Sequence, residues 1–379
     1  MTNRQKVLFI IIILILFIAP FFCHMSIGGD DGKFYYLFPL EFLKNFSNEN
    51  IYNDLGYFNP TQFLIPFSFI LFLSKKILFF LNTQKLFFGL NLSCSFLFFY
   101  LFLKVPINDR TKENDDFLAR ITSSLFYSLS IFSYYTLWNT QLLSVYLISI
   151  FPLIMFLFFK SVKDNKVIYS ILGSLILSLS SISILSIPWL LTLVIASLPI
   201  LTYLLIKNKK VFIKCLIIFL VIFFLLNAYW IIGFLSSIKD SNNPLNHNSA
   251  TDFQEQNINI IESVSQNNNI FYPFFNLFHK NIQIDYDWPM KDVYLSYLIK
   301  LLPLNFIFLL LVLLPTFFYK KSSKENQSLY TISIISWLIV LFLFTAKIGK
   351  WGVPLFIWLA NNIPGFVMFR NMYDKFGTA

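Results

Sequence analysis

The stretch VFIKCLIIFLVIFFLLNAYWIIGFL, residues 211–235, decides the class of fold to which this chain belongs. Its one charged residue is Lys214, close to its start. A helix of about 20 apolar residues is long enough to cross the ~30 Å hydrocarbon core of a bilayer. The stretch therefore predicts a transmembrane helix.

The composition of the whole chain extends this prediction. Apolar residues make up 57% of the 379 residues and charged residues only 13%, whereas a soluble domain is nearer a quarter charged. We therefore expect an all-α, polytopic membrane domain over residues 1–379, with about nine transmembrane helices. The predicted spans are residues 7–23, 84–104, 117–137, 141–159, 167–185, 187–206, 211–235, 301–319 and 328–346.

The first apolar run, residues 7–23, follows Arg4 and Lys6 and resembles a signal peptide. It is long for the apolar core of a signal peptide, and no A-x-A cleavage site follows it. We interpret it as an uncleaved first helix.

The distribution of basic residues predicts the topology. The run 61–82 is interrupted by Pro66 and by the pair Lys75 and Lys76. If it does not span, more than half of the 29 Lys and Arg residues fall in short loops on the side of the N-terminus. This is the positive-inside pattern of a cytoplasmic membrane protein. We therefore expect 34–46 and 61–82 to be interfacial or re-entrant helices on the outer face, and the clustering of the charge between apolar runs excludes nucleic acid as a partner.

Three pieces then lie on the outer face, at residues 24–83, 236–300 and 347–379. Because the inner loops are short, we expect the chemistry to take place outside. The three histidines and three cysteines lack zinc-ligand spacing, and no phosphate-binding glycine loop is present. The sequence implies no organic cofactor and leaves open whether a divalent cation takes part. The chain ends without a closing helix or charged tail, so we expect it to be the N-terminal part of a longer protein.

The first candidate site is the segment 28–33 (Gly-Gly-Asp-Asp-Gly-Lys), directly after the first predicted helix. Two adjacent carboxylates, Asp30 and Asp31, are unfavourable at a membrane surface unless they are paired or used. Glycines beside them allow a sharp turn and a close approach to a ligand. The alternative interpretation is a solvated turn, since Asp-Gly is a common turn dipeptide.

Two later segments also combine charged and aromatic residues. His279, Asp287 and Trp288 lie in a stretch that suits sugar binding, or else forms an interfacial aromatic belt. Arg370, with Asn371 and Lys375, lies on the outer side against the charge bias. A guanidinium group binds phosphate through a bidentate fork, although contact with lipid headgroups is the alternative.

The order of these segments resembles the GT-C class of membrane glycosyltransferases, and within it the arabinofuranosyltransferase D family of mycobacteria. Gly29-Asp30 resembles the Gly-Asp element that this family has after its first helix. Residues 56–60 (Gly-Tyr-Phe-Asn-Pro) and 63–66 (Phe-Leu-Ile-Pro) resemble its aromatic and proline-rich outer stretch. Residues 369–376 resemble its late Arg-Asn-x-x-Lys-Phe element, with one extra residue before Lys375.

The resemblance implies an enzyme that transfers a sugar from a polyprenyl-phosphate donor to a glycan acceptor outside the cell. On that reading Asp30 is the base, Asp31 is its alternative, and Arg370 binds the leaving phosphate in an inverting displacement. The alternatives are a lipid-linked oligosaccharide transporter, an envelope-assembly scaffold, and an enzyme like the O-antigen ligases, which use a lipid-diphosphate donor. Transporters tend to show internal repeats and charged residues within spans. This sequence shows no internal repeat, its spans carry almost no charge, and its candidate acids lie in the predicted outer loops, which favours the enzyme.

Overall fold

The computed structural model describes residues 2–19, 36, 38–47, 62–78, 82–104, 113–129, 142–180, 187–239, 258–259, 261–262, 324–346, 350–363 and 366. Every regular element among these residues is a helix, as the composition predicts. The chain forms two compact units, one of residues 1–187 and 207–244 and one of residues 188–206 and 245–379.

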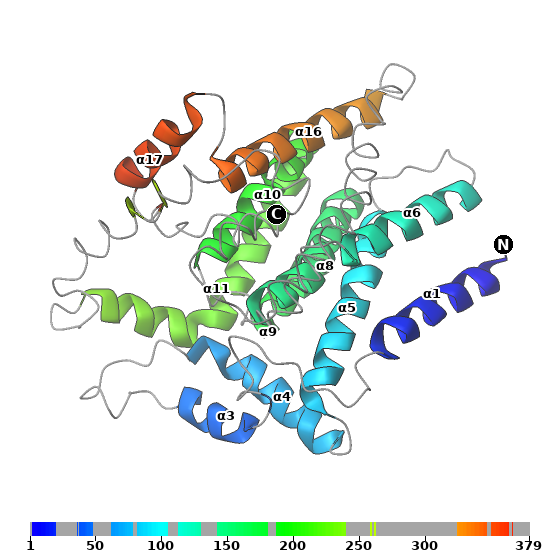
Figure 1. The fold of residues 1–379 in the computed structure, drawn as a ribbon, viewed down its shortest axis with the longest axis horizontal. Helices are drawn as coiled ribbons and strands as arrows, with labels where there is room; N and C mark the ends of the chain where they lie inside the picture. Colours follow the sequence, from blue (N-terminus) through cyan, green and yellow to red (C-terminus); the bar gives the residue numbers. More distant parts are fainter. Residues whose placement is uncertain are drawn as a thin grey trace, which may run out of the picture. The chain divides into compact units, whose positions relative to one another are not determined.

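The first unit is a helical bundle with a short layer at one end (Figure 1). Its elements are α1 (Asn3–Ile18), α3 (Pro39–Ser47), the 3-10 helix η3 (Gln62–Leu64), α4 (Ile65–Ile77), α5 (Thr83–Phe102), α6 (Glu113–Ser128), α8 (Leu142–Asp164), α9 (Val167–Leu179) and α11 (Lys209–Lys239).

Side-chain contacts fix the direction in which α1 and α8 run beside α5. Phe17 near the end of α1 packs edge-on against Phe96 in the middle of α5 at 5.8 Å between ring centroids. Phe9, nearer the start of α1, and Tyr100, nearer the end of α5, both pack on Phe117 of α6, at 6.4 Å and 6.3 Å. Higher numbers in α1 therefore meet lower numbers in α5, so the two helices are antiparallel. Helix α8 is parallel to α5, because Ser149 bonds to Asn91 at 2.7 Å and Phe159 packs on Phe102 at 5.9 Å.

Helix α9 returns along α8 after a tight turn at Asn165, whose φ of 52° is left-handed, a conformation that asparagine adopts more readily than most residues. The hydroxyls of Ser161 and Ser170 lie 2.7 Å apart across this antiparallel pair. Helix α11 then runs parallel to α9, since Ser174 donates to the carbonyl oxygen of Phe219 at 2.9 Å. Gly173 permits this approach, because a Cβ atom there would lie 3.3 Å from the Phe219 ring.

These directions place the basic helix ends of the first unit together, at what we call the basic end. Lys6 lies over the ring of Phe117, and Lys104 and Arg120 both lie over the ring of Tyr100. The end of α8 and the starts of α9 and α11 lie at this same end. Their lysines are Lys160, Lys163, Lys166, Lys209, Lys210 and Lys214.

The opposite end of the first unit is covered by α3, η3, α4 and Tyr36, which we call the capping layer. Helices α3 and α4 lie side by side near the start of α5 (Figure 1). Proline at the start of α4 and the pair Lys75 and Lys76 at its end bound a helix of 13 residues, about 20 Å long. It is too short to cross a ~30 Å hydrocarbon core unaided.

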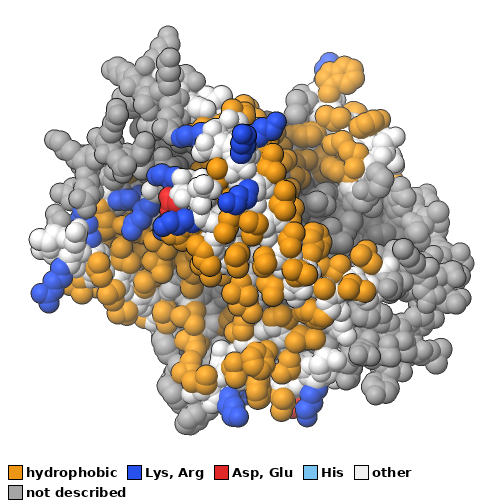
Figure 2. Space-filling model, turned by 180° about the vertical axis from the view of Figure 1, so that it is seen from behind, with side chains coloured by type: hydrophobic (Ala, Val, Ile, Leu, Met, Phe, Trp, Pro, Cys, Tyr) orange, Lys and Arg blue, Asp and Glu red, His pale blue; other side chains and the backbone are white. Residues whose placement is uncertain are grey.

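Two described helical segments are long and apolar enough to cross a membrane, Thr83–Phe102 and Lys209–Gly233. In the most apolar part of the second segment only 17% of the residues are buried. The exposed side chains of this segment include Leu225 and Ile232, at 68% and 65% exposure. On the face drawn in Figure 2, hydrophobic side chains cover a broad area and Lys and Arg side chains gather in groups. A soluble protein seldom leaves so continuous an apolar surface uncovered.

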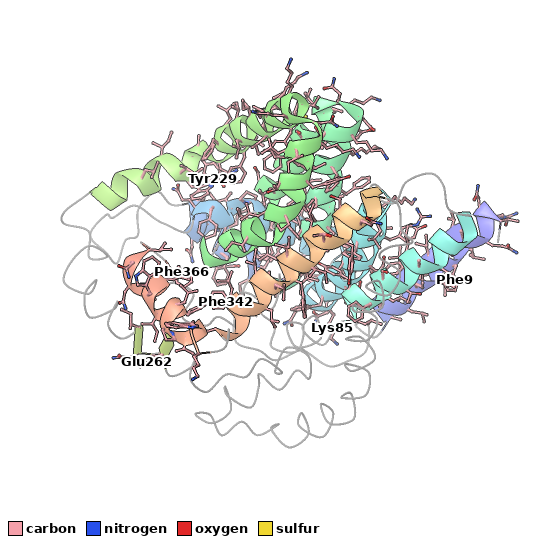
Figure 3. All side chains as sticks on the ribbon, turned by 90° about the horizontal axis from the view of Figure 1, so that it is seen from above. Phe9, Lys85, Tyr229, Glu262, Phe342 and Phe366 are labelled. Atoms are coloured by element: carbon pink, nitrogen blue, oxygen red, sulfur yellow. The ribbon has the colours of Figure 1, made fainter. Side chains whose placement is uncertain are left out.

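The second unit contains α10 (Ile187–Lys207), a short segment at residues 258–262, α16 (Lys324–Thr345) and α17 (Gly352–Asn362). Phe342 of α16 packs on Phe356 of α17 at 6.2 Å between ring centroids. Figure 3 shows Glu262 beside α17, and the neighbouring Ile261 is completely buried.

Most predicted spans correspond to described helices, with shifts of a few residues. Helix α6 starts four residues before the predicted span 117–137, and residues 130–141 lie outside the described part. The predicted spans 167–185 and 187–206 correspond to two separate helices, α9 and α10, and residues 181–186 between them lie outside the described part. The span 301–319 lies outside the described residues, and α17 was not predicted.

Candidate functional site

The site residues predicted from the sequence lie outside the described part of the structure: Asp30, Asp31, His279, Asp287, Trp288, Arg370, Asn371 and Lys375. Their roles stay predictions. Two described residues, Tyr36 and Phe366, flank the acidic segment and the arginine segment along the chain, and both are firmly packed.

Tyr36 attaches the first predicted outer loop to the bundle. It is 4% exposed, and its ring lies 5.5 Å from that of Phe87 and 6.1 Å from that of Phe88, both on α5. Phe63 and Phe67 of the capping layer belong to the same buried cluster. The chain six residues after Asp30 is therefore held at the start of α5.

Polar residues are buried both in the capping layer and at the start of α5. Asn82 caps α5 by accepting from the backbone N–H of Lys85 at 3.2 Å. Gln62, Gln84 and Lys85 are each only 8% exposed. The start of a helix carries partial positive charge, and the ammonium group of Lys85 adds to it. This end of α5 consequently favours a negatively charged group nearby.

Lys85, which is labelled in Figure 3, was not predicted as a site residue. The sequence did contain a signal for it. Lys85 lies at the outer edge of the predicted span 84–104, which is the side of the membrane where the positive-inside rule disfavours lysine. Ser68 of α4 was also missed. Its hydroxyl is buried and has no hydrogen-bond partner among the described residues, so this end of the unit retains hydrogen-bonding capacity.

A polar clamp connects α11 to the capping layer. Asn227 is 1% exposed and donates to the hydroxyl of Ser178 on α9 and to the carbonyl oxygen of Phe223, both at 2.8 Å. Its side-chain oxygen accepts from Nε1 of Trp230 at 2.9 Å. Trp230 in turn packs edge-on against Phe63 of η3 at 5.7 Å between ring centroids. The clamp thereby orients the residue that supports the capping layer.

Replacing Asn227 with alanine is expected to destabilise the first unit by about 1–2 kcal/mol, because Trp230 Nε1 and the Ser178 hydroxyl both lose a buried partner. Thermal unfolding of the purified protein in detergent measures this. The matched control is Asn362→Ala, which removes a similar bond to the carbonyl oxygen of Trp358 from an exposed asparagine. An equal loss of thermal stability in the two variants would contradict the stabilising role of the Asn227 clamp.

Phe366 holds the segment that leads to Arg370. Its ring lies 5.1 Å from that of Phe356, which is completely buried on α17 (Figure 3). The backbone N–H of Phe366 donates to the carbonyl oxygen of Ile363 at 3.0 Å. The chain four residues before Arg370 is therefore attached to α17, within the second unit.

The described residues contain no group of three or more His, Cys, Asp or Glu side chains that could hold a metal ion. The question of a divalent cation stays open, because the acidic segment 28–33 is outside that part of the chain.

No protein-family model, curated protein or solved structure matches this chain.

Proposed function

We propose that this chain is a polytopic cytoplasmic-membrane glycosyltransferase of the GT-C type, resembling the arabinofuranosyltransferases. It transfers a sugar from a polyprenyl-phosphate donor to a glycan acceptor on the outer face of the membrane. Its partners are the lipid-linked donor, the acceptor glycan and the bilayer itself.

The apolar surface of the bundle supports placement in a membrane. Helix α11 has buried polar residues where it meets α9 and exposed Ile, Leu and Phe side chains elsewhere. Small and hydroxyl-bearing residues between helices, with large apolar residues facing outward, are typical of helices packed in lipid.

One observation supports the proposal most directly. Tyr36 is packed on the capping layer, at the end of the first unit opposite the basic end. Asp30 is tethered to Tyr36 by six residues, a reach of no more than about 22 Å. With the basic end inside the cell, as the positive-inside rule requires, the acid pair belongs to the outer face. A lipid carrier and a water-soluble acceptor can meet there.

The proposed reaction is a single displacement. Asp30 accepts the proton of the acceptor hydroxyl as its oxygen attacks the anomeric carbon of the donor sugar. The bond between that carbon and the phosphate oxygen breaks, and the bonding electrons leave with the polyprenyl phosphate. Arg370 binds the departing phosphate through its guanidinium fork. Attack opposite to the leaving group inverts the anomeric configuration.

The proposed function is tested by finding which class of lipid-linked donor the protein uses. Membranes that contain the protein are supplied with one labelled sugar, linked either to polyprenyl phosphate or to polyprenyl diphosphate, together with an acceptor glycan. We expect label to enter the glycan from the monophosphate donor only. Transfer from the diphosphate donor alone would indicate an enzyme like the O-antigen ligases. Transfer from neither donor would contradict the proposed glycosyltransferase activity.

The topology on which the proposal rests predicts that Ser74 on α4 and Asn268 face the same side. In a background without native cysteines, Ser74→Cys and Asn268→Cys are both expected to react with an impermeant thiol reagent in intact cells. Lys163→Cys, at the basic end, is the protected control. Labelling of one outer position without the other would contradict the nine-span arrangement.

A further inference from the structure

The ends of three helices in the first unit are locked together by a small buried junction. The hydroxyl of Ser161 on α8 lies 2.7 Å from that of Ser170 on α9 and 3.1 Å from Sγ of Cys215 on α11. All three residues are completely buried. The junction holds the helix ends, and the side chains that surround them, in a fixed arrangement.

Six lysines surround this junction and form what we call the lysine patch. Lys160 and Lys214 directly precede two of the junction residues, and the other four lie within about two helical turns along the chain. The patch consists of Lys160, Lys163, Lys166, Lys209, Lys210 and Lys214. All are exposed except Lys160, which is partly buried, with its Nζ 4.7 Å from the centroid of the Tyr169 ring.

The patch is strongly positive. Asp164 is the one acidic residue in the helix ends that form it, residues 160–170 and 209–215. On the face drawn in Figure 2, blue side chains gather around a single red one. So concentrated a positive charge, held on a rigid junction, attracts a phosphate-bearing partner.

Apolar side chains beside the patch indicate which phosphate-bearing partner it fits. Ile168 of α9 and Ile213 and Ile217 of α11 are exposed by 51%, 41% and 54%. Each lies within a few residues of a patch lysine. A soluble phosphate would leave these side chains in water, whereas a phospholipid covers them with its acyl chains while its headgroup meets the lysines.

We propose that the lysine patch is a binding site for the headgroup of an anionic phospholipid. The site does not depend on the proposed glycosyl transfer, because it lies at the basic end and uses none of the residues assigned to that reaction.

Native mass spectrometry of the delipidated full chain tests the proposal, with added dioleoylphosphatidylglycerol or the zwitterionic dioleoylphosphatidylcholine as the probe. We expect tighter binding of phosphatidylglycerol. The variant Lys209→Gln/Lys210→Gln should weaken that binding about 25-fold, because each lysine near an anionic lipid surface contributes roughly fivefold. The variant Lys163→Gln/Lys166→Gln is an independent test with the same expectation.

The matched control is Lys75→Gln/Lys76→Gln, an equally exposed adjacent pair on α4 in the capping layer, which should retain wild-type affinity. Thermal unfolding shows whether each variant is folded. We expect all of them to be folded, because the substituted lysines are exposed. Equal binding of the two lipids, equal losses for the patch and control pairs, or displacement of phosphatidylglycerol by millimolar inorganic phosphate would each overturn the proposal.

Discussion

Replacing Asp30 with asparagine is expected to slow glycosyl transfer by about 10²- to 10⁴-fold, the usual contribution of a positioned general base. Asparagine keeps the shape of the side chain and removes its basicity, so the acceptor proton has no place to go as the bond to phosphate breaks. The protein should still fold and insert, because the buried cluster that holds Tyr36 consists of apolar and aromatic side chains. Initial rates in membranes, normalised to the amount of inserted protein, measure the effect.

The matched control is Glu41→Gln on α3, which neutralises an exposed carboxylate in the same predicted outer loop. It should leave the rate within about twofold of wild type. Asp31→Asn distinguishes the two neighbouring acids. If only Asp31→Asn abolishes transfer, their roles exchange and the mechanism stands. Full activity of the double variant would place the base elsewhere and contradict our interpretation of residues 28–33.

Replacing Arg370 with alanine is expected to weaken binding of the polyprenyl-phosphate sugar by about 100-fold. Hydrogen bonds to a charged group each contribute about 1.5–3 kcal/mol, so losing a bidentate pair removes about 3 kcal/mol, and each 1.4 kcal/mol is tenfold. Arg370→Lys keeps the charge and loses the fork, so its affinity should lie between those of alanine and wild type. Isothermal titration with a short-chain donor in detergent gives these affinities directly.

Lys350→Ala is the control for lost positive charge, because Lys350 is exposed and lies in the same predicted outer stretch, 347–379. It should bind the donor as wild type does. Unchanged affinity in Arg370→Ala would remove Arg370 from the site. Loss of affinity in both variants would point to general electrostatic attraction rather than to a specific phosphate fork.

The sequence predicted the helices of the first unit well because two local signals agree there. Apolar runs give α5 and α11, and the lysine clusters at 160–166 and 207–214 mark where α8 ends and where α11 begins. Pro66 and the lysine pair predicted that the run 61–82 is an interfacial or re-entrant segment, and α4 covers only 13 of these residues. These features are local, so propensity and charge suffice to find them.

Features that depend on long-range packing were not predictable in the same way. Nothing near Tyr36 in the sequence shows that its ring packs on Phe87, about fifty residues later. The bond of Asn227 to Ser178 likewise joins residues 49 apart. Asn227 is the one amide in the apolar stretch 211–235, but the sequence does not show which of the serines of α9 is its partner. Helix α17 was missed because its apolar run is short and follows a predicted span. The acid pair and Arg370 stay sequence predictions, because they lie outside the described residues.

The most direct test of the proposed function is to reconstitute the purified protein in vesicles with a polyprenyl-phosphate donor, labelled in its sugar, and an acceptor glycan. Both the labelled glycan and the released polyprenyl phosphate are quantified. We predict that they appear in equal amounts, and that the Asp30→Asn/Asp31→Asn variant produces neither above background. Movement of intact donor across the bilayer without loss of its sugar would instead identify a transporter and contradict the proposed enzyme.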